Sequence, residues 1–288
     1  MEEYASLIID IEKSRVYGID DRNILQNYML YCIEKLNVLF KDNIEHDVIF
    51  SAGDELQGLF SDVTTAIMYF RLLEMLLKPV NLRAGVGIGT WTVKIANGVS
   101  TQQDGPVYHR ARYAIEEAYS KPFHNIRICS DLQGSEVEIL ANHLVNTSNV
   151  LKRDQIYKQN IVLVIVELLC PFIKNQMKWD SYKIIKELLE LKYFYRIGKR
   201  VTNYRIKEND IEEELYFEED AQIEPIFIDG EMNDADAYIL KKSITTFIAK
   251  ILGCSRQNVD SILRRGHTNK IRELDYIALQ YIERIYGK

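Results

Sequence analysis

Two acidic side chains occupy positions where carboxylates commonly do chemistry. Asp10 lies near the end of the apolar run at residues 6–11 (SLIIDI), and Asp54 lies in the turn segment 52–54 between two further apolar runs. Carboxylate oxygens are the ligands that Mg²⁺ and Mn²⁺ prefer, and these ions keep open positions for phosphates and water. The pair therefore predicts a Mg²⁺ or Mn²⁺ site with Asp10 and Asp54 as its ligands. Such ions lower the pKa of an attacking hydroxyl and neutralise a leaving pyrophosphate.

The residues next to these carboxylates extend the prediction to a nucleotide. Glu55 follows Asp54 directly and is a candidate catalytic residue beside Asp10 and Asp54. Backbone N–H groups where a strand turns into a helix can receive phosphate oxygens. On this reasoning the nucleotide-binding candidates near the carboxylates are Ile11, Glu12, Lys13, Ser14, Arg15 and Gly53.

A purely structural role is the alternative for both aspartates. Asp54 would then be an ordinary turn residue. Asp10 would cap the following helix or pair with Arg15 or Arg83, because a buried carboxylate without a partner costs several kcal/mol.

The elements that must bring the two aspartates together follow from hydrophobic periodicity. Strands are expected at residues 6–11, at 46–60 as a hairpin with a tight turn, at 82–89 and at 126–129. Helices are expected at 20–40, 63–77 and 107–119. The order strand, helix, strand, strand, helix, strand, followed by a helix and a strand, predicts an α+β, ferredoxin-like palm over residues 1–132. That fold places the hairpin beside the first strand, so Asp10 and Asp54 would meet.

The rest of the chain is expected to be helical. Residues 133–206 form a helical connector, with helices at 161–173 and 179–191 and a short hairpin at 193–206. Residues 207–236 carry thirteen Asp or Glu against one Lys and are expected to be an acidic linker or insertion. A few apolar residues there, Ile226 and Phe227 among them, are candidates for docking on the body of the protein. Residues 237–288 form the last domain.

That last domain contains a pattern typical of a helix-turn-helix. Ala249 is small enough for two helices to cross closely, Gly253 supplies the turn, and Val259 packs the second helix on the first. Ser255 is a good N-cap for the second helix. Residues 241–288 hold ten Lys or Arg against four Asp or Glu, which favours double-stranded DNA as a partner. The alternative is a helical hairpin used for packing or dimerisation.

In a helix-turn-helix the N-terminal side chains of the second helix contact bases in the major groove. The candidates for this role are Ser255, Arg256, Gln257, Ser261 and Arg264. The candidates for phosphate contacts are Lys241, Lys242, Arg265, Lys270 and Arg272.

The N-terminal motifs resemble two related families. LIIDIEKSR and AGDEL resemble the first-strand motif and the signature motif of GGDEF domains. LRAGVGIG followed by GPVYHRARYAIE resembles class III nucleotidyl cyclases. The resemblance implies a metal-ligand role for Asp10 and Asp54. It places His109 where cyclases have a transition-state Asn and Tyr113 where they have Arg.

Those departures favour binding of a nucleoside triphosphate over cyclisation. Arg110 and Arg112 are neighbours that could replace the missing Arg, since a guanidinium braces a phosphate with two hydrogen bonds. His109 and Arg110 therefore join the nucleotide-binding candidates, and Arg112 joins the catalytic ones.

The chain also resembles the SatD family. DIEKS at 10–14, GDELQGL at 53–59 and GPVYHRARYAI at 105–115 are similar to that family's motifs, and the similarity returns in the C-terminal helix-turn-helix. This resemblance implies no defined activity.

Composition limits the cellular setting. No apolar run is long enough to cross a membrane, the N-terminus lacks the pattern of a secretory signal, and four widely spaced cysteines form no CxxC pair. We therefore expect a cytoplasmic protein with no membrane contact.

The leading hypothesis is a nucleotide-responsive DNA-binding regulator. It would act as a homodimer, because related palms share a composite site and helix-turn-helix proteins bind two half-sites. The alternatives are an active nucleotidyl cyclase or cyclic-oligonucleotide synthase, and a catalytically empty dimerisation scaffold.

Overall fold

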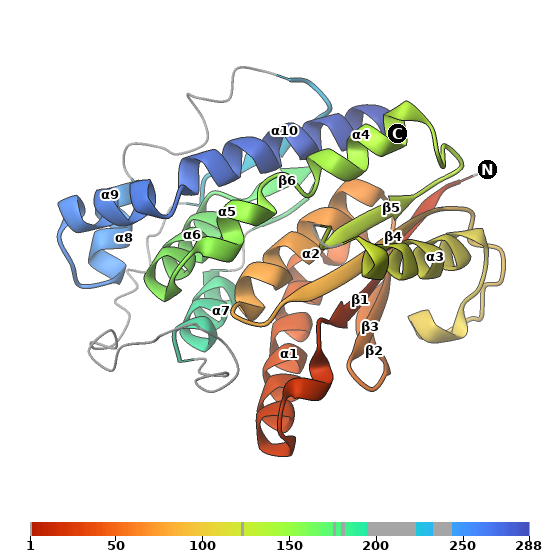
Figure 1. Cartoon of the computed structure of the whole chain (residues 1–288), viewed down its shortest axis with the longest axis horizontal. Helices are drawn as coiled ribbons and strands as arrows, with labels where there is room; N and C mark the ends of the chain where they lie inside the picture. Colours follow the sequence, from red (N-terminus) through yellow and green to blue (C-terminus); the bar gives the residue numbers. More distant parts are fainter. Residues whose placement is uncertain are drawn as a thin grey trace.

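The computed structural model describes residues 2–121, 124–174, 177–179, 182–194, 223–232 and 244–287. It has a mixed α+β architecture in which a five-stranded sheet lies at one end and a helical region extends to the other (Figure 1). The predicted hairpin at 193–206 falls largely outside the described residues, as do most of the acidic stretch and both Lys241 and Lys242.

The sheet has the strand order β2-β3-β1-β4-β5. β1 pairs antiparallel with β3 and β4, β2 pairs antiparallel with β3, and β5 joins β4 in parallel. The strands are β1 (Tyr4–Ile11), β2 (Ile44–Ala52), β3 (Glu55–Phe60), β4 (Leu82–Gly89) and β5 (Ile126–Cys129). The predicted order of strands and helices over this part of the chain is confirmed.

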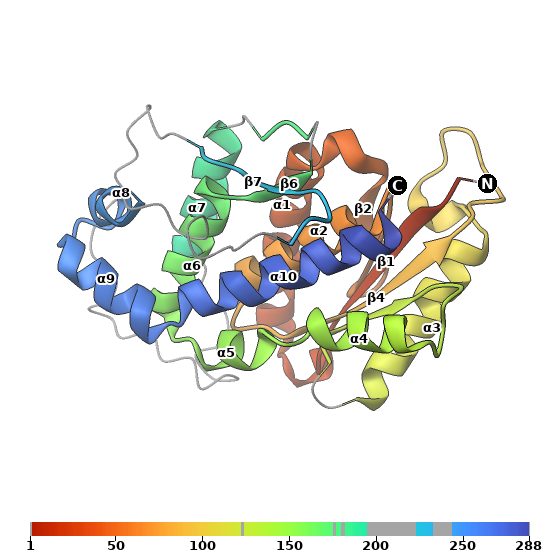
Figure 2. The same ribbon diagram turned by 90° about the horizontal axis from the view of Figure 1, so that it is seen from above.

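Helices cover both faces of the sheet (Figures 1 and 2). Side chains of a strand point alternately to opposite faces, so Leu7 and Ile9 enter the main core with α1 (Ile19–Leu39) and α2 (Val63–Leu77). Ile8 points the other way and packs against α3 (Pro106–Ser120). The sheet is therefore a middle layer between two helical layers.

Glycines in β4 let α3 lie unusually close to the sheet. A Cβ added at Gly85 would lie 2.3 Å from the Ile115 nitrogen, and one added at Gly87 would lie 2.2 Å from the Ala111 nitrogen. No side chain fits in that space, so the glycine spacing of LRAGVGIG follows from close backbone approach. This contact holds α3 over the end of β1 that carries Asp10.

The sequence had suggested that the region after β5 is helical. The structure shows that it also contains strands. Its helices are α4 (Glu136–Leu144), α5 (Asn149–Asp154), α6 (Tyr157–Leu169) and α7 (Tyr182–Phe194). It also contains β6 (Phe172–Lys174) and β7 (Ile226–Ile228), which pair in parallel. The helix predicted at 161–173 ends at Leu169, because Pro171 cannot continue it, and residues 172–174 form β6 instead. Three-residue strands are too short to show a period of two. Three-residue 3-10 helices occur at η1 (Ser14–Val16), η2 (Lys41–Asn43) and η3 (Ser100–Gln102).

The chain ends in α8 (Ile244–Ile251), α9 (Arg256–Arg265) and α10 (Thr268–Tyr286). Gly253 has φ +58°, which is the left-handed conformation required at the turn between α8 and α9. The Ser255 side chain accepts a hydrogen bond from the Asn258 N–H at 3.2 Å and caps α9. Val259, on α9 itself, is fully buried. The long α10 runs from α9 across α2 and α4 (Figure 2).

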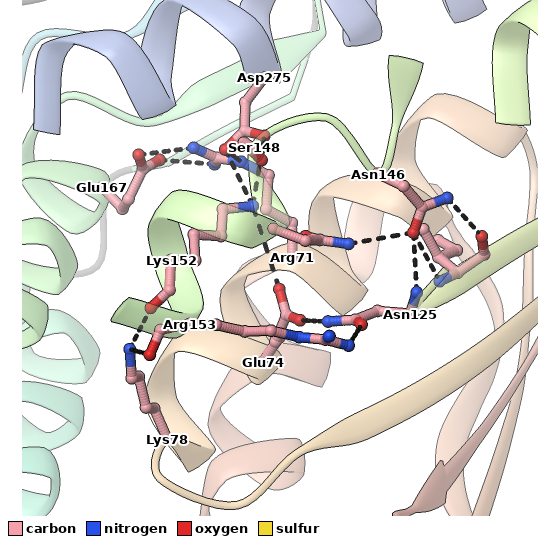
Figure 3. Close-up of polar contacts among 12 residues, drawn as sticks. Arg71, Glu74, Lys78, Asn125, Asn146, Ser148, Lys152, Arg153, Glu167 and Asp275 are labelled. Atoms are coloured by element: carbon pink, nitrogen blue, oxygen red, sulfur yellow. Dashed lines mark hydrogen bonds and ion pairs between the residues drawn. The ribbon is translucent and has the colours of Figure 1, made fainter. Parts of the chain in front are cut away.

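A buried network of charged side chains joins α10 to the sheet unit, which consists of β1–β5 with α1, α2 and α3 (Figure 3). Arg71 on α2 donates to both oxygens of Glu167 on α6 at 2.6 Å and through Nε to Asp275 on α10 at 2.5 Å. Lys152 on α5 lies 3.1 Å from Asp275, and the Ser148 hydroxyl donates to the same carboxylate. All five side chains are buried. Each charge has an opposite partner, as a buried ion requires.

One predicted DNA contact belongs to this network instead. Arg272 is fully buried, lies 2.7 Å from Glu167 and donates to the Cys170 carbonyl oxygen at 2.6 Å. Its expected role as a phosphate contact is therefore wrong. Charge and sequence position suggested a surface arginine, and only the packing of α10 places it in the core.

Candidate functional site

The predicted carboxylates lie at the end of β1, on the face of the sheet covered by α3. Asp10 is paired in register with Arg83 on β4, and Ile9 is paired with Leu56 on β3. Because alternate residues share a face, Asp10 points to the same side as Ile8, which packs on α3. Glu55 precedes Leu56 and therefore lies on that side too.

Asp54 is held nearby by the β2–β3 hairpin. Ala52 pairs with Glu55, and Gly53 has φ +62° at the first central position of the two-residue turn. The Asp54 Oδ2 atom is buried and has no hydrogen-bond partner within the described residues. A buried anionic oxygen without a donor is costly, so this atom is suited to receive a cation.

The Asp10 carboxyl is affected by burial and by its charged neighbours. Burial raises the pKa of Asp10, and the negative charges of Asp54 and Glu55 raise it further, against the lowering effect of a hydrogen bond from the Tyr119 hydroxyl. The pairing of Ile9 with Leu56 and of Ala52 with Glu55 places the β2–β3 hairpin, and with it Asp54 and Glu55, beside the end of β1 that carries Asp10. The structure thus brings Asp10, Asp54 and Glu55 together, as the sequence predicted.

Helix α3 contributes two side chains one above the other. Arg112 donates to both oxygens of Glu55, with distances of 2.5 and 2.8 Å, and Tyr119 donates to Asp10. Ser51 also donates to Glu55 at 2.8 Å. Burial raises the pKa of Glu55, but the bonds from Arg112 and Ser51 outweigh it, so the pKa is lowered overall. Glu55 is therefore an anion with its charge matched.

Arg83 completes the cluster from β4. Its Nη2 lies 3.1 Å from Glu12 Oε1, and its guanidinium lies over the Tyr119 ring at 5.0 Å from the centroid. The pairing of Asp10 with Arg83, one of the structural alternatives, is not what the side chains adopt. Arg83 binds Glu12, and Asp10 binds Tyr119.

The backbone predicted to bind phosphate, at residues 11–15 and Gly53, is only partly available for that role. The Glu12 N–H donates to the Asn81 carbonyl oxygen at 2.8 Å, and the Ile11 side chain is in the core. Lys13 has φ +58°, and Ser14 and Arg15 form η1. The Gly53 carbonyl oxygen accepts from Gln26 at 3.4 Å.

Two predicted residues of α3 lie away from the carboxylates. Arg110 donates to the Ile88 carbonyl oxygen at 2.5 Å, and Ile88 pairs with Ala5 on β1. Asp10 is five residues further along that strand, roughly 17 Å at 3.4 Å per residue. His109 is exposed and lies 3.3 Å from Asp104. The structure does not bring either residue to the acidic cluster.

Within the described residues, no group of three or more His, Cys, Asp and Glu side chains is arranged to hold a metal ion. An ion bound by Asp10 and Asp54 would therefore take its remaining ligands from phosphate and water oxygens. Mg²⁺ commonly binds in this way, through one or two carboxylates together with phosphates and water.

Tyr119 and Arg83 were not among the site residues predicted from sequence. Tyr119 follows Arg112 by seven residues, a spacing that places both on one side of a helix. Arg83 is the second residue of the strand motif that contains the glycines. Both signals are visible in the sequence, but they become informative only when the register of β1 and β4 and the direction of α3 are known.

The candidate DNA-binding residues lie at the other end of the molecule, on α9 (Figure 1). Ser255, Arg256, Gln257 and Arg264 are exposed, and Ser261 is half-buried. Arg265 and Lys270 are exposed as well, although Lys270 pairs with Glu273 at 2.8 Å. Arg256 lies 4.0 Å from Asp260, an exposed pair that contributes little to stability.

The fold and the site define a mixed α+β protein with a carboxylate cluster at a sheet edge and a C-terminal helical region. The family model described as the SatD family matches residues 4–207, which is 204 of the 288 residues. The chain belongs to the SatD family. Comparison with curated proteins finds none that matches it. Among the described helices, none is long and apolar enough to cross a membrane.

Proposed function

We propose that this protein is a nucleotide-responsive DNA-binding regulator. Residues 1–132 would act as a divergent cyclase-like palm that binds a nucleoside triphosphate with Mg²⁺ or Mn²⁺. The observation that carries the proposal is the placement of Asp10, Asp54 and Glu55 where the end of β1 meets the β2–β3 hairpin, with one buried Asp54 oxygen that has no partner among the described residues.

The strand order supports the palm assignment. The first four strands follow the order β2-β3-β1-β4 with every neighbour antiparallel. That is the arrangement of a ferredoxin-like βαββαβ unit, with β5 added at the edge. In this arrangement Asp10 and Asp54 would bind the ion, which would in turn bind phosphate oxygens. The ion supplies charge neutralisation when bound.

The second half of the proposal is a helix-turn-helix formed by α8 and α9. The left-handed Gly253, the Ser255 cap and the buried Val259 support it. So does the exposed outer face of α9 with Arg256, Gln257 and Arg264. A homodimer would present two such helices to two half-sites.

A direct test measures DNA binding with and without nucleotide. The full chain is titrated against labelled duplex fragments at fixed salt, alone and with Mn²⁺ plus each of the four ribonucleoside triphosphates. We expect one triphosphate to change the apparent Kd at least about fivefold, the lower end of typical coupling between sites. Asp54→Asn should keep DNA binding and lose the change. Asp20→Asn, an exposed aspartate on α1, should behave as the unaltered protein. Equal Kd values under all conditions would refute the regulator.

An active nucleotidyl cyclase or cyclic-oligonucleotide synthase is the second candidate, favoured by the same carboxylates. It predicts release of pyrophosphate with Mn²⁺ and a triphosphate, abolished in Asp54→Ala. Arg112 is engaged with both oxygens of Glu55, so catalysis would require that ion pair to open. A scaffold with an empty palm would instead give no heat with any metal–triphosphate in calorimetry.

A further inference from the structure

We infer that Arg83 is the phosphate-binding arginine of this site and that it exchanges Glu12 for the polyphosphate of the nucleotide. The inference rests on the proposed nucleotide-binding function. It replaces Arg110 and Arg112 of helix α3, to which the sequence pointed, with an arginine of strand β4.

Arg83 is in the right place for this role. It stands opposite Asp10 in the register of β1 and β4, so its side chain shares the α3 face with the carboxylates. The Arg83 side chain is 21% exposed and the Glu12 side chain 17% exposed. Both therefore lie at the rim of the cluster, where an incoming ligand can reach the guanidinium and where Glu12 can turn into water.

The three arginines Arg83, Arg110 and Arg112 differ in where they lie and in how many of their hydrogen-bond donors are already in use. A guanidinium has five N–H donors. Arg112 uses two of them on Glu55, and Arg110 is bound to the Ile88 carbonyl oxygen about five residues away along the strand. Within the described residues Arg83 donates one hydrogen bond, to Glu12 at 3.1 Å. Most of its donors are left for a ligand.

The guanidinium is also held in a defined orientation. It lies over the Tyr119 ring, with 5.0 Å between the guanidinium carbon and the ring centroid. Stacking on an aromatic face leaves the edge of the guanidinium plane, which carries its donors, open to a phosphate. A donor that is already oriented loses less side-chain entropy on binding.

The net charge of the cluster gives the order in which the cation and the polyphosphate bind. Its ionisable members are Asp10, Glu12, Asp54, Glu55, Arg83 and Arg112, which sum to −2 when all are charged. One divalent cation brings the sum to zero. The polyphosphate then adds negative charge beside Arg83, and the guanidinium can bind it through two parallel hydrogen bonds while the Glu12 carboxylate turns into water.

The test separates the metal from the phosphates. Binding of Mn²⁺ alone, of Mn²⁺ with each ribonucleoside triphosphate, and of Mn²⁺ with inorganic tripolyphosphate is measured by calorimetry on the full chain. The variants are Arg83→Gln, Asp10→Asn and the matched control Arg127→Gln, an arginine on the neighbouring strand β5. Inorganic tripolyphosphate has no base, so it reports on phosphate contacts alone.

We expect Arg83→Gln to bind Mn²⁺ as the unaltered protein does and to lose about ten- to hundredfold in affinity for the triphosphate that binds and for tripolyphosphate, the range for hydrogen bonds to charged groups. Arg127→Gln should match the unaltered protein. If the unaltered protein binds a metal–triphosphate and Asp10→Asn does not, but Arg83→Gln binds normally, the inference is wrong and the proposed function stands. If the unaltered protein binds no triphosphate, the proposed function itself fails.

Discussion

The buried ion network offers the sharpest test of how the two halves of the molecule are held together. Replacing Asp275 by Asn keeps the size of the side chain and removes one negative charge from a site that is 5% exposed. Arg71 and Lys152 then lose the carboxylate that lies 2.5 and 3.1 Å from them. These two cations then face a neutral amide. The NH2 group of that amide is a hydrogen-bond donor and cannot accept from them.

The expected cost is large because the site is dry. Removing one partner of a buried ion pair costs about 3–5 kcal/mol, since the remaining charge is left uncompensated. Glu167 still binds Arg71 and Glu74 still lies 3.9 Å from Lys152, which places the estimate near the lower end, at about 3 kcal/mol. Ser148→Ala removes only a neutral donor to the same carboxylate and should cost about 1.5 kcal/mol, the lower end for a hydrogen bond to a charged group.

Urea unfolding of the full chain measures these differences. The control is Asp260→Asn, the same substitution on α9 at a side chain that is 53% exposed and 4.0 Å from its partner Arg256. The control should change the free energy of unfolding by less than about 1 kcal/mol. If Asp275→Asn and Asp260→Asn unfold at the same urea concentration with the same slope, the network does not stabilise the junction and the reasoning is wrong.

Three further outcomes are expected, each at a different part of the structure. Gly87→Ala should destabilise the protein by about 3 kcal/mol in thermal unfolding, because the added Cβ meets the α3 backbone, whereas Gly18→Ala, with open space around it, should have little effect. The pKa values of Glu167 and Asp275 are lowered: burial raises them, but the neighbouring cations outweigh it. Their stabilisation is therefore present at neutral pH and should be lost as the pH falls below about 4, with a shallower loss in Asp275→Asn. Arg256→Ala should weaken duplex DNA binding about tenfold in an anisotropy titration, while Arg284→Ala, exposed at the far end of α10, should not.

The elements of the sheet unit could be predicted from sequence because their signals are local. Apolar residues with a period of two or of about 3.6 mark strands and helices, and the Gly53 turn marks the hairpin. The meeting of Asp10 with Asp54 and Glu55 then follows from the order of those elements. The turn before α9 and the Ser255 cap were also predicted correctly, since both depend on a few adjacent residues.

Partners that are distant in sequence could not be predicted in this way. Arg272 looks like a surface cation of a basic segment, yet it is fully buried beside Glu167, 105 positions earlier in the chain. The pairing of β6 with β7 joins segments more than 50 residues apart and gives no local signal. Packing of α10 on the sheet unit decides both.

The sequence by itself determined the strands and helices of residues 1–132 and the end of the sheet at which the carboxylates gather, because hydrophobic period and turn chemistry depend on neighbouring residues. Only the tertiary structure decided which cations face those carboxylates. It placed Arg83 and Tyr119 at the site and took Arg110 away from it, since the register of β4 and the close approach of α3 arise from contacts across the fold.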